Sequence, residues 1–176
     1  MMTRHASTLP VLGFAAASGT GKTTLLTQLL PLLNQAGLRV GLIKHSHHDF
    51  EIDHAGKDSF RLRKAGATPV VLVSKYRRAM IEEFYHQTEP KLAAQVALFS
   101  TEQVDLILVE GFRHEAFDKI ELHRPCLGQA PLYPHDKQII AIASDEVLNV
   151  PTALPLLNLN QPADIAKFIL QRYLTS

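Results

Sequence analysis

The feature that most constrains this chain is a run of small residues at positions 13 to 25, Gly-Phe-Ala-Ala-Ala-Ser-Gly-Thr-Gly-Lys-Thr-Thr-Leu. An apolar segment, residues 11–17, leads into it, and a leucine-rich amphipathic segment follows it. Gly19 and Gly21 allow a turn tight enough for successive backbone N–H groups to point at one anion. A strand, such a loop and a helix in this order predict a loop that holds the phosphates of a nucleotide.

The polar residues of this loop have distinct expected roles. Lys22 supplies a positive charge to the β- and γ-phosphates, and the Thr23 hydroxyl can ligate Mg²⁺. The other residues expected to contact the nucleotide are Ser18, Gly19, Thr20, Gly21 and Thr24. Ala16 stands where the usual pattern has its first glycine, and alanine is small enough there unless the position needs a positive φ.

Composition agrees with a compact nucleotide-binding protein. The chain has 176 residues, 46% of them hydrophobic and 20% charged, which is typical of one globular domain. A net charge of +1 without a basic run gives no reason to expect nucleic-acid binding. The lone Cys126 suits a reducing compartment, and no apolar stretch reaches the roughly 18 residues of a membrane span. We therefore expect a soluble cytoplasmic protein that does not enter membranes.

The rest of the sequence alternates between apolar strands and helices. We expect helices at 22–36, 57–65, 92–99 and 163–174, and further strands at 40–44, 69–73, 104–109, 139–143 and 154–159. Strands that are apolar on both faces and separated by helices indicate a mainly parallel sheet with helices on both faces. The predicted fold is therefore α/β, a three-layer P-loop NTPase fold, with residues 1–176 forming a single nucleotide-binding domain.

Residues 113–137 interrupt this alternation. A plausible strand at 119–124 is followed by Pro125, Gly128, Pro131 and Pro134. Ile120 and Leu122 alternate with polar residues, as in a hairpin with one apolar face. Because such a face needs a partner, we expect a projecting β-hairpin that pairs with a second subunit in a homodimer.

A second carboxylate is expected to complete the metal site. Glu110 follows the most apolar strand of the chain, and Gly111 after it permits a sharp turn. Its carboxylate can hold Mg²⁺ at the edge of the site, where P-loop enzymes more often use aspartate. The alternative is that Glu110 is only a solvent-facing acid at a strand end. Asp105 precedes the same strand at its opposite end and is expected to be structural.

A histidine-rich segment follows the strand at 40–44. His45, His47, His48 and His54 are four of the nine histidines of the chain. Imidazole suits Zn²⁺ or Ni²⁺, but no cysteine accompanies these residues and their spacing fits no structural zinc pattern, so polar and anion contacts are the alternative. Because the segment is expected to overhang the nucleotide, Asp49 or Asp53 could order the water shell of the metal or the attacking water. Lys57 opens a helix whose N–H groups could hold another anion.

Base recognition has one candidate in the late strand 139–143. Asp145 follows this strand, and a carboxylate there can accept hydrogen bonds from guanine N1–H and the 2-amino group, a pair of donors that adenine lacks. Helix capping by Ser144 or Asp145 is the alternative role.

Four segments together resemble the molybdopterin-guanine dinucleotide biosynthesis adapter protein B (MobB) family. They are the loop at 15–26, Gly-Leu-Ile-Lys-His-Ser-His-His-Asp at 41–49, residues 56–67 with Gly-Lys-Asp-Ser and Arg-Lys-Ala-Gly-Ala, and Asp-Leu-Ile-Leu-Val-Glu-Gly-Phe at 105–112. The first alone would be generic, whereas the second and third in this order and spacing are typical of the family. The resemblance covers nearly the whole chain, and the family tolerates alanine at position 16.

The resemblance implies a cytoplasmic homodimer that binds GTP and has weak GTPase activity. From the residues themselves, we expect Mg²⁺ to accompany the GTP and Lys22, Glu110 and Asp49 to lie closest to the chemistry. Its main role would be that of an adapter for the molybdenum cofactor guanylyltransferase, which joins GMP to molybdopterin, and for molybdopterin-carrying enzymes. In such a protein the 113–137 segment would build an intersubunit sheet.

Two other classes share parts of the pattern. A P-loop ligase or kinase of the dethiobiotin synthetase type would need a deep acceptor pocket with general bases, for which only the histidine-rich segment offers candidates. A nickel-type metallochaperone GTPase would use the histidines as ligands. Equilibrium dialysis with Ni²⁺ and Zn²⁺ and a phosphate-release assay with candidate acceptors separate the three classes.

Overall fold

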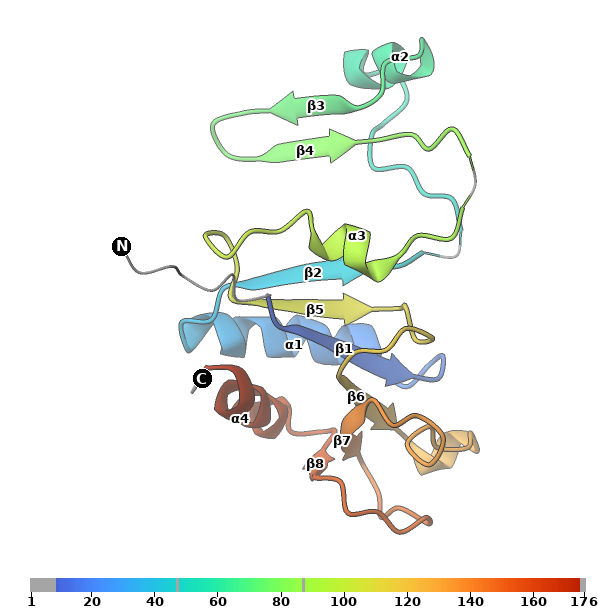
Figure 1. Ribbon diagram of the computed structural model, residues 1–176, viewed down its shortest axis with the longest axis vertical. Coiled ribbons are helices and arrows are strands. Elements are labelled where there is room, and N and C mark those ends of the chain that lie inside the picture. The colour runs from blue at the N-terminus through green and yellow to red at the C-terminus, as the bar shows by residue number, and fades with distance from the viewer. Residues whose placement is uncertain (1–8, 47, 87, 175–176) are drawn as a thin grey trace, which may run out of the picture. The chain divides into compact units, whose positions relative to one another are not determined.

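The computed structural model describes residues 9–46, 48–86 and 88–174, which form two compact units (Figure 1). The first unit combines the chain up to His45 with the chain from Lys91 onward, and the second is Ser46–Pro90. The single domain 1–176 expected from the sequence stays a prediction. The parallel sheet belongs to the first unit, and so does the loop at residues 17–21, which is called the phosphate loop below because of its predicted role.

A six-stranded sheet in the order β2-β5-β1-β6-β7-β8 forms the centre of the first unit, and all its neighbouring strands are parallel. The strands are β1 (Val11–Ala16), β2 (Val40–Lys44), β5 (Leu106–Glu110), β6 (Lys119–His123), β7 (Ile139–Ser144) and β8 (Leu156–Asn158). β1, which leads into the phosphate loop, is an interior strand between β5 and β6. Parallel strands place their carboxyl ends at one edge, where ligands of such sheets bind.

Helices cover this sheet on both faces (Figure 1). α1 (Lys22–Gln35) and α4 (Pro162–Tyr173) bury Leu29, Leu33 and Ile165 against Leu12 and other residues of one face. α3 (Leu92–Val96) packs on the other face through Leu92, in a separate cluster with β2 and β5. The predicted three-layer, mainly parallel α/β fold is confirmed.

The ends of two elements show why the sequence folds this way locally. α1 ends at Gln35 and Gly37 follows with φ of 89°, a conformation that glycine adopts without strain. Asp105, just before β5, accepts hydrogen bonds from Arg39 N and Nε at 2.8 and 2.9 Å. This Arg39 pairing lowers the pKa of Asp105 to about 2, so the structural role predicted for Asp105 is confirmed.

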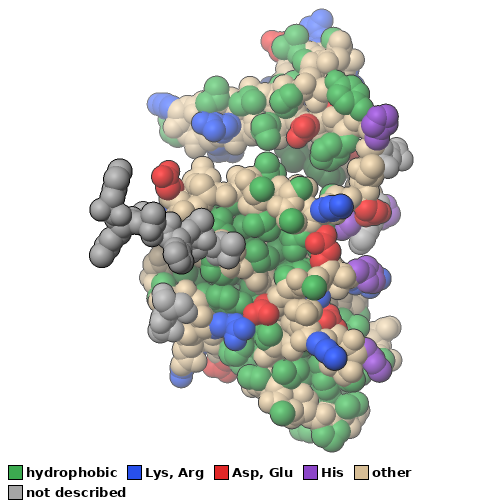
Figure 2. All heavy atoms as spheres, viewed as in Figure 1, with side chains coloured by type: hydrophobic (Ala, Val, Ile, Leu, Met, Phe, Trp, Pro, Cys, Tyr) green, Lys and Arg blue, Asp and Glu red, His purple; other side chains and the backbone are tan. Residues whose placement is uncertain are grey.

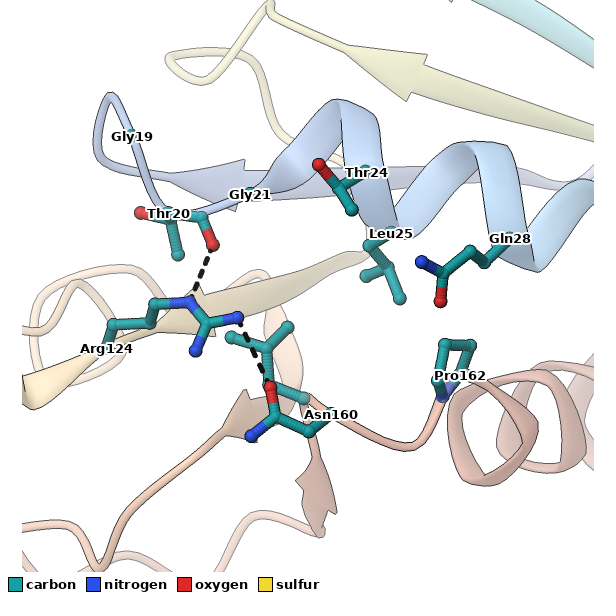
Figure 3. A pocket seen from close by; sticks show the side chains of 10 residues that line it. Gly19, Thr20, Gly21, Thr24, Leu25, Gln28, Arg124, Asn160 and Pro162 are labelled. Carbon is teal, nitrogen blue, oxygen red and sulfur yellow. Dashed lines mark hydrogen bonds between the residues drawn. The ribbon is translucent and has the colours of Figure 1, made fainter.

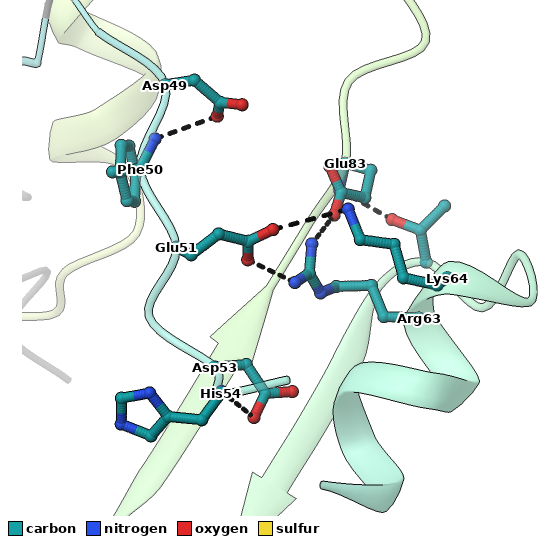
Figure 4. Close-up of polar contacts among 9 residues, drawn as sticks. Asp49, Phe50, Glu51, Asp53, His54, Arg63, Lys64 and Glu83 are labelled. Atoms are coloured by element: carbon teal, nitrogen blue, oxygen red, sulfur yellow. Dashed lines mark hydrogen bonds and ion pairs between the residues drawn. The ribbon is translucent and has the colours of Figure 1, made fainter. Parts of the chain in front are cut away.

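The second unit contains α2 (Asp58–Lys64) and two antiparallel strands, β3 (Val70–Val73) and β4 (Arg78–Ile81). The side chain of Arg63 is 5% exposed and bridges the carboxylates of Glu51 and Glu83, which ties the entry and exit of the unit to its helix (Figure 4). The strand predicted at 69–73 therefore exists, but it pairs with β4 in a two-stranded sheet of its own and not within the parallel sheet.

The prediction that residues 113–137 project as a hairpin is wrong. β6 lies inside the parallel sheet between β1 and β7, and a short 3₁₀ helix, η1 (Pro125–Leu127), follows it. Ile120 and Leu122 are 0% and 2% exposed because they face α1 and α4 in the core. They cannot form the intersubunit contact that was expected, since helices of the same chain already cover them.

Among the residues that the structure describes, no helix is both long and apolar enough to cross a membrane.

Candidate nucleotide-binding site

The phosphate loop between β1 and α1 has the backbone that its sequence predicts. Gly19 and Gly21 have φ of 80° and 95°, and an added Cβ would meet nothing within 4 Å at Gly19. Glycine is therefore needed here for its backbone conformation and not for space. Ala16 lies in β1, and among the described residues Phe112 is the one residue other than glycine with positive φ, so alanine at position 16 adds no strain.

A pocket of about 350 Å³ adjoins this loop (Figure 3). Gly19, Thr20 and Gly21 form one wall, and Thr24 and Gln28 of α1 form the next. The segment that joins β8 to α4 closes the far side with Leu159, Asn160 and Pro162. Lys22 is half-buried at the first position of α1, whereas Ser18, Thr23 and Thr24 are exposed at the loop. Four of the predicted nucleotide-contacting residues of the loop thus line a pocket of nucleotide scale, whereas Ser18, Lys22 and Thr23 lie outside its lining.

Arg124, which the sequence analysis did not identify, connects three segments around this pocket. Its Nε donates to the carbonyl oxygen of Thr20 at 3.0 Å, and its Nη2 donates to Asn160 Oδ1 at 3.3 Å (Figure 3). Its Nη1 donates to Asp145 Oδ2. The guanidinium therefore fixes the phosphate loop relative to the segments that follow β7 and β8. Its place directly after β6, at the carboxyl edge of the sheet, was the one available signal in the sequence.

Asp145 lies beside Arg124, and its side chain is 13% exposed. Its Oδ1 atom is buried and has no hydrogen-bond partner within the described part of the chain. The helix-capping role considered for Ser144 or Asp145 is wrong, because the next described element after β7 is β8 and Ser144 instead accepts from Glu146 N. A buried carboxylate oxygen without a donor is costly unless a ligand supplies one.

Glu110 is the last residue of β5, and its side chain is 16% exposed. The neighbouring strand β2 places Lys44 opposite it, and Lys44 Nζ donates to Glu110 Oε2 at 3.1 Å. The carboxylate is thus held at the carboxyl edge of the sheet, near the end of β1. It is not simply a solvent-facing acid, because burial and an ion pair fix its position.

A strained turn follows Glu110. Gly111 and Phe112 have φ of 104° and 50°, and the Phe112 ring stacks on His45 with centroids 4.7 Å apart. An added Cβ on Gly111 would lie 2.5 Å from His45 Cβ. Positive φ at a bulky residue costs energy, and such strain is concentrated at functional sites. The turn brings the backbone after β5 against the backbone after β2.

The remaining predicted residues lie in the second unit, apart from His45. Asp49 is exposed and its Oδ1 accepts from Phe50 N at 2.9 Å, and Lys57 precedes the seven-residue helix α2. Their contact with a nucleotide stays a prediction. His47 lies outside the described residues. Within the described ranges, the group of metal-ligating side chains close enough to share an ion is Cys126, Asp145 and Glu146, so the histidine metal site gains no support there.

Comparisons with known proteins agree on one family. A family model described as "Molybdopterin guanine dinucleotide synthesis protein B" matches residues 11–145. A protein of Escherichia coli strain K12, named molybdopterin-guanine dinucleotide biosynthesis adapter protein, is 46% identical over 93% of each chain. A protein of the same name from Haemophilus influenzae is 40% identical over 92% of this chain and 88% of its own.

Solved structures agree with the sequence relatives. A crystal structure of molybdopterin-guanine biosynthesis protein B is similar with a TM-score of 0.69 and 27% identity, covering 92% of this chain and 99% of that one. Bacillus subtilis MobB has the same fold, with a TM-score of 0.73 at 22% identity over 94% of this chain and 98% of its own. With this family model, these relatives and the matching parallel sheet, the chain belongs to the MobB family of molybdopterin guanine dinucleotide synthesis proteins.

Proposed function

We propose that this chain binds GTP with Mg²⁺ at the loop between β1 and α1, hydrolyses it slowly, and acts as an adapter in molybdopterin guanine dinucleotide biosynthesis. The observation that carries the nucleotide proposal is the buried, unpartnered Oδ1 of Asp145, whose Oδ2 accepts from Arg124 in the lining of the pocket beside the phosphate loop. The names of the two bacterial relatives support the adapter role.

The phosphate end of the proposed site rests on the loop itself. Successive N–H groups between Gly19 and Lys22 and the N-terminal end of α1 favour a polyanion. Lys22 brings a positive charge to the phosphates, and Thr23 and Glu110 are the residues that would hold Mg²⁺. When bound, the metal would neutralise charge that develops on the phosphates. Lys44 holds the Glu110 carboxylate in place through an ion pair, and its positive charge partly offsets the negative charge of the carboxylate.

The base end rests on Asp145. Guanine offers two adjacent donors, N1–H and the 2-amino group, and an ionised carboxylate has about four lone-pair sites in total. Arg124 donates one hydrogen bond to Oδ2 of Asp145 and leaves Oδ1 without a partner. Guanine N1–H and its 2-amino group can therefore donate to the carboxylate while Arg124 stays bound. Adenine presents an acceptor at N1, which would face the carboxylate and repel it. The pocket should therefore favour GTP over ATP.

We propose a homodimer whose interface includes the β3–β4 sheet, in place of the 113–137 segment. A two-stranded sheet alone is marginally stable in water. Val71, Val73 and Met80 on it are 53%, 73% and 53% exposed, and Figure 2 shows hydrophobic side chains at the surface of this unit. A second copy of the same sheet can cover such a surface with two-fold symmetry. The molybdenum cofactor guanylyltransferase is the proposed partner enzyme of this dimer.

Nucleotide titration tests the proposal directly. Calorimetry with GTP, GDP, ATP and CTP, each with and without Mg²⁺, should show tightest binding for GTP with Mg²⁺. Asp145→Asn should lower the preference for GTP over ATP by about tenfold or more, since a bidentate pair discriminates bases by roughly 1–3 kcal/mol. Glu146→Gln is the matched control, because Glu146 is exposed and adjacent in sequence. Equal affinity for all four nucleotides would refute the guanine site.

Sedimentation tests the dimer separately. The wild type should sediment as a dimer at micromolar concentration, and Val71→Lys with Val73→Lys should yield a monomer that still binds GTP. Retention of the dimer in this variant would place the interface elsewhere.

A further inference from the structure

Arg124 has hydrogen-bonding capacity that its contacts within the protein do not use. A guanidinium carries five N–H groups in a planar fork. Its Nε donates to the Thr20 carbonyl oxygen, its Nη1 to Asp145 Oδ2 and its Nη2 to Asn160 Oδ1. Among the described residues Arg124 has no further acceptor, so one N–H group on Nη1 and one on Nη2 are left for a ligand.

These N–H groups belong to a side chain that lines the pocket beside the phosphate loop. Arg124 is 28% exposed, and Figure 3 shows its Nη2 on the side of the guanidinium that faces Asn160 across the pocket. A Cβ added to Gly21 would lie 3.9 Å from Nη2, so this atom lies close to the residue that precedes α1. The Nη2 contact with Asn160 is long, at 3.3 Å, and is easily exchanged for a better acceptor. A ligand in the pocket therefore lies next to the guanidinium.

The position of the guanidinium is fixed before a ligand arrives. The hydrogen bond to the Thr20 carbonyl oxygen holds it at the phosphate loop, and the ion pair with Asp145 holds it at the end of β7. An arginine fork that is already oriented loses little conformational freedom when it binds one more acceptor. Arg124 is therefore suited to recognise an acceptor at one defined position.

Arg124 and Asp145 together place a donor beside an acceptor. Nη1 and Oδ2 are hydrogen-bonded to each other, so the remaining N–H groups of Arg124 and the unpartnered Oδ1 of Asp145 belong to adjacent side chains. Guanine presents the complementary order, because its O6 accepts and the neighbouring N1–H and 2-amino groups donate. Adenine presents the reverse order, with a 6-amino donor beside an N1 acceptor. Arginine is also the side chain that most often contacts guanine O6 in nucleic-acid recognition.

A phosphate oxygen is the other acceptor that could use these N–H groups. The ion pair with Asp145 offsets the positive charge of Arg124, which makes the guanidinium less attractive to a polyanion than an unpaired cation would be. Lys22 and the N-terminal end of α1 already serve the phosphates in the proposed site. The neutral carbonyl group at position 6 of guanine therefore fits Arg124 better.

We propose that Arg124 is a specificity-determining residue that donates a hydrogen bond to O6 of guanine, beside the Asp145 carboxylate. This inference rests on the proposed guanine site and adds a second contact to it. Adenine would bring its 6-amino group against the guanidinium, so that a donor faces a donor. Arg124 thus acts on the bound base directly, in addition to holding the phosphate loop.

6-Thioguanosine triphosphate tests the contact, because it replaces O6 by sulfur, a weak acceptor, and keeps N1–H and the 2-amino group. In calorimetry with Mg²⁺, the wild type should bind GTP about tenfold more tightly than this probe, since a hydrogen bond from a charged donor is weakened. Arg124→Met should bind the two nucleotides with equal affinity. It keeps most of the side-chain volume, so a loss caused only by the larger sulfur would persist in the variant.

Arg39→Met is the matched control. Arg39 also pairs with a carboxylate, that of Asp105, and donates to two carbonyl oxygens, but it directly precedes β2 at the opposite edge of the sheet. This control should keep the wild-type ratio of the affinities for GTP and the probe.

Two results would overturn the O6 contact. One is equal affinity of the wild type for GTP and the probe, which needs no variant that folds. The other is an unchanged ratio in Arg124→Met. Either result together with a preference for GTP over ATP would leave the guanine site intact, whereas equal affinity of the wild type for GTP and ATP would refute the guanine site and the contact with it.

Discussion

Replacing Arg124 by Met should destabilise the fold and weaken nucleotide binding together. The substitution keeps most of the side-chain volume and removes three hydrogen bonds, to Thr20, Asp145 and Asn160. It leaves the Asp145 carboxylate, which is 13% exposed, without its cation. Because Arg124 is 28% exposed, the pair is less costly to break than a fully buried one.

The expected loss of unfolding free energy is about 2–4 kcal/mol. The ion pair with Asp145 should account for roughly 2 kcal/mol of it and the hydrogen bond to the Thr20 carbonyl for about 1 kcal/mol. The contact with Asn160, at 3.3 Å, is long for a hydrogen bond and should add little.

A double-mutant cycle in urea measures the part that belongs to the pair. Arg124→Met and Asp145→Asn should each destabilise the protein, and the double variant should lose less than the sum, with a coupling energy of about 1–2 kcal/mol. GTP affinity of Arg124→Met should fall although the phosphate loop sequence is intact. Additive losses, or a variant with full stability and full affinity, would refute the view that Arg124 organises the pocket.

Four further outcomes follow from the same geometry. Lys22→Ala should abolish triphosphate binding by calorimetry while the circular dichroism spectrum stays unchanged, and retained affinity would contradict the phosphate site. Glu110→Gln should keep most GTP binding but lose its Mg²⁺ dependence and the slow phosphate release; hydrolysis at the wild-type rate would exclude Glu110 from the metal site. Ile120→Lys should unfold the chain and not merely separate a dimer, since Ile120 is 0% exposed, so a folded monomer would contradict the position of β6. Burial raises the pKa of Glu121 above its unfolded value, so its favourable contribution is present at low pH and is lost as pH rises through the folded pKa. The melting temperature of the wild type relative to Glu121→Gln should therefore fall as pH rises above the usual pKa of a glutamate, and a rise would contradict the sign.

The parts of the fold that were predicted correctly depend on local signals. β2 begins and ends at the predicted residues. α1 ends one residue before the predicted end, because the leucine spacing and Gly37 just after the helix mark its C-terminus locally. The strand, loop and helix at residues 11–35 were predictable for the same reason. The position of Glu110 at the end of β5 was also predictable from its neighbours, because the apolar run of that strand ends at Glu110 and Gly111. The roles of the loop and of Glu110 in nucleotide binding stay predictions.

The position of β6 was not predictable in this way. Alternation of Ile120 and Leu122 with Lys119 and Glu121 is the same for a hairpin edge and for a buried strand whose second face is covered by charged contacts. The difference lies in hydrogen bonds from Leu132 N and Tyr133 N to Glu121, and no local pattern encodes them. A polar face of a strand normally indicates that this face is exposed to solvent. In β6 the polar face is instead buried under the chain segment that contains Leu132 and Tyr133.

The register of β6 also explains why Arg124, a residue outside the loop motif, controls the loop. Phe14 pairs with Ile120 and Ala16 pairs with Leu122, so the chain after β6 leaves the sheet beside the first residues of the phosphate loop. Arg124 then reaches the Thr20 carbonyl across 104 positions of sequence. The burial of Ile120 and Leu122 fixes this register, because a shift of one residue would turn both side chains to the charged face. The same two residues that were expected to hold a partner subunit therefore position the arginine that links the phosphate loop to the proposed guanine site.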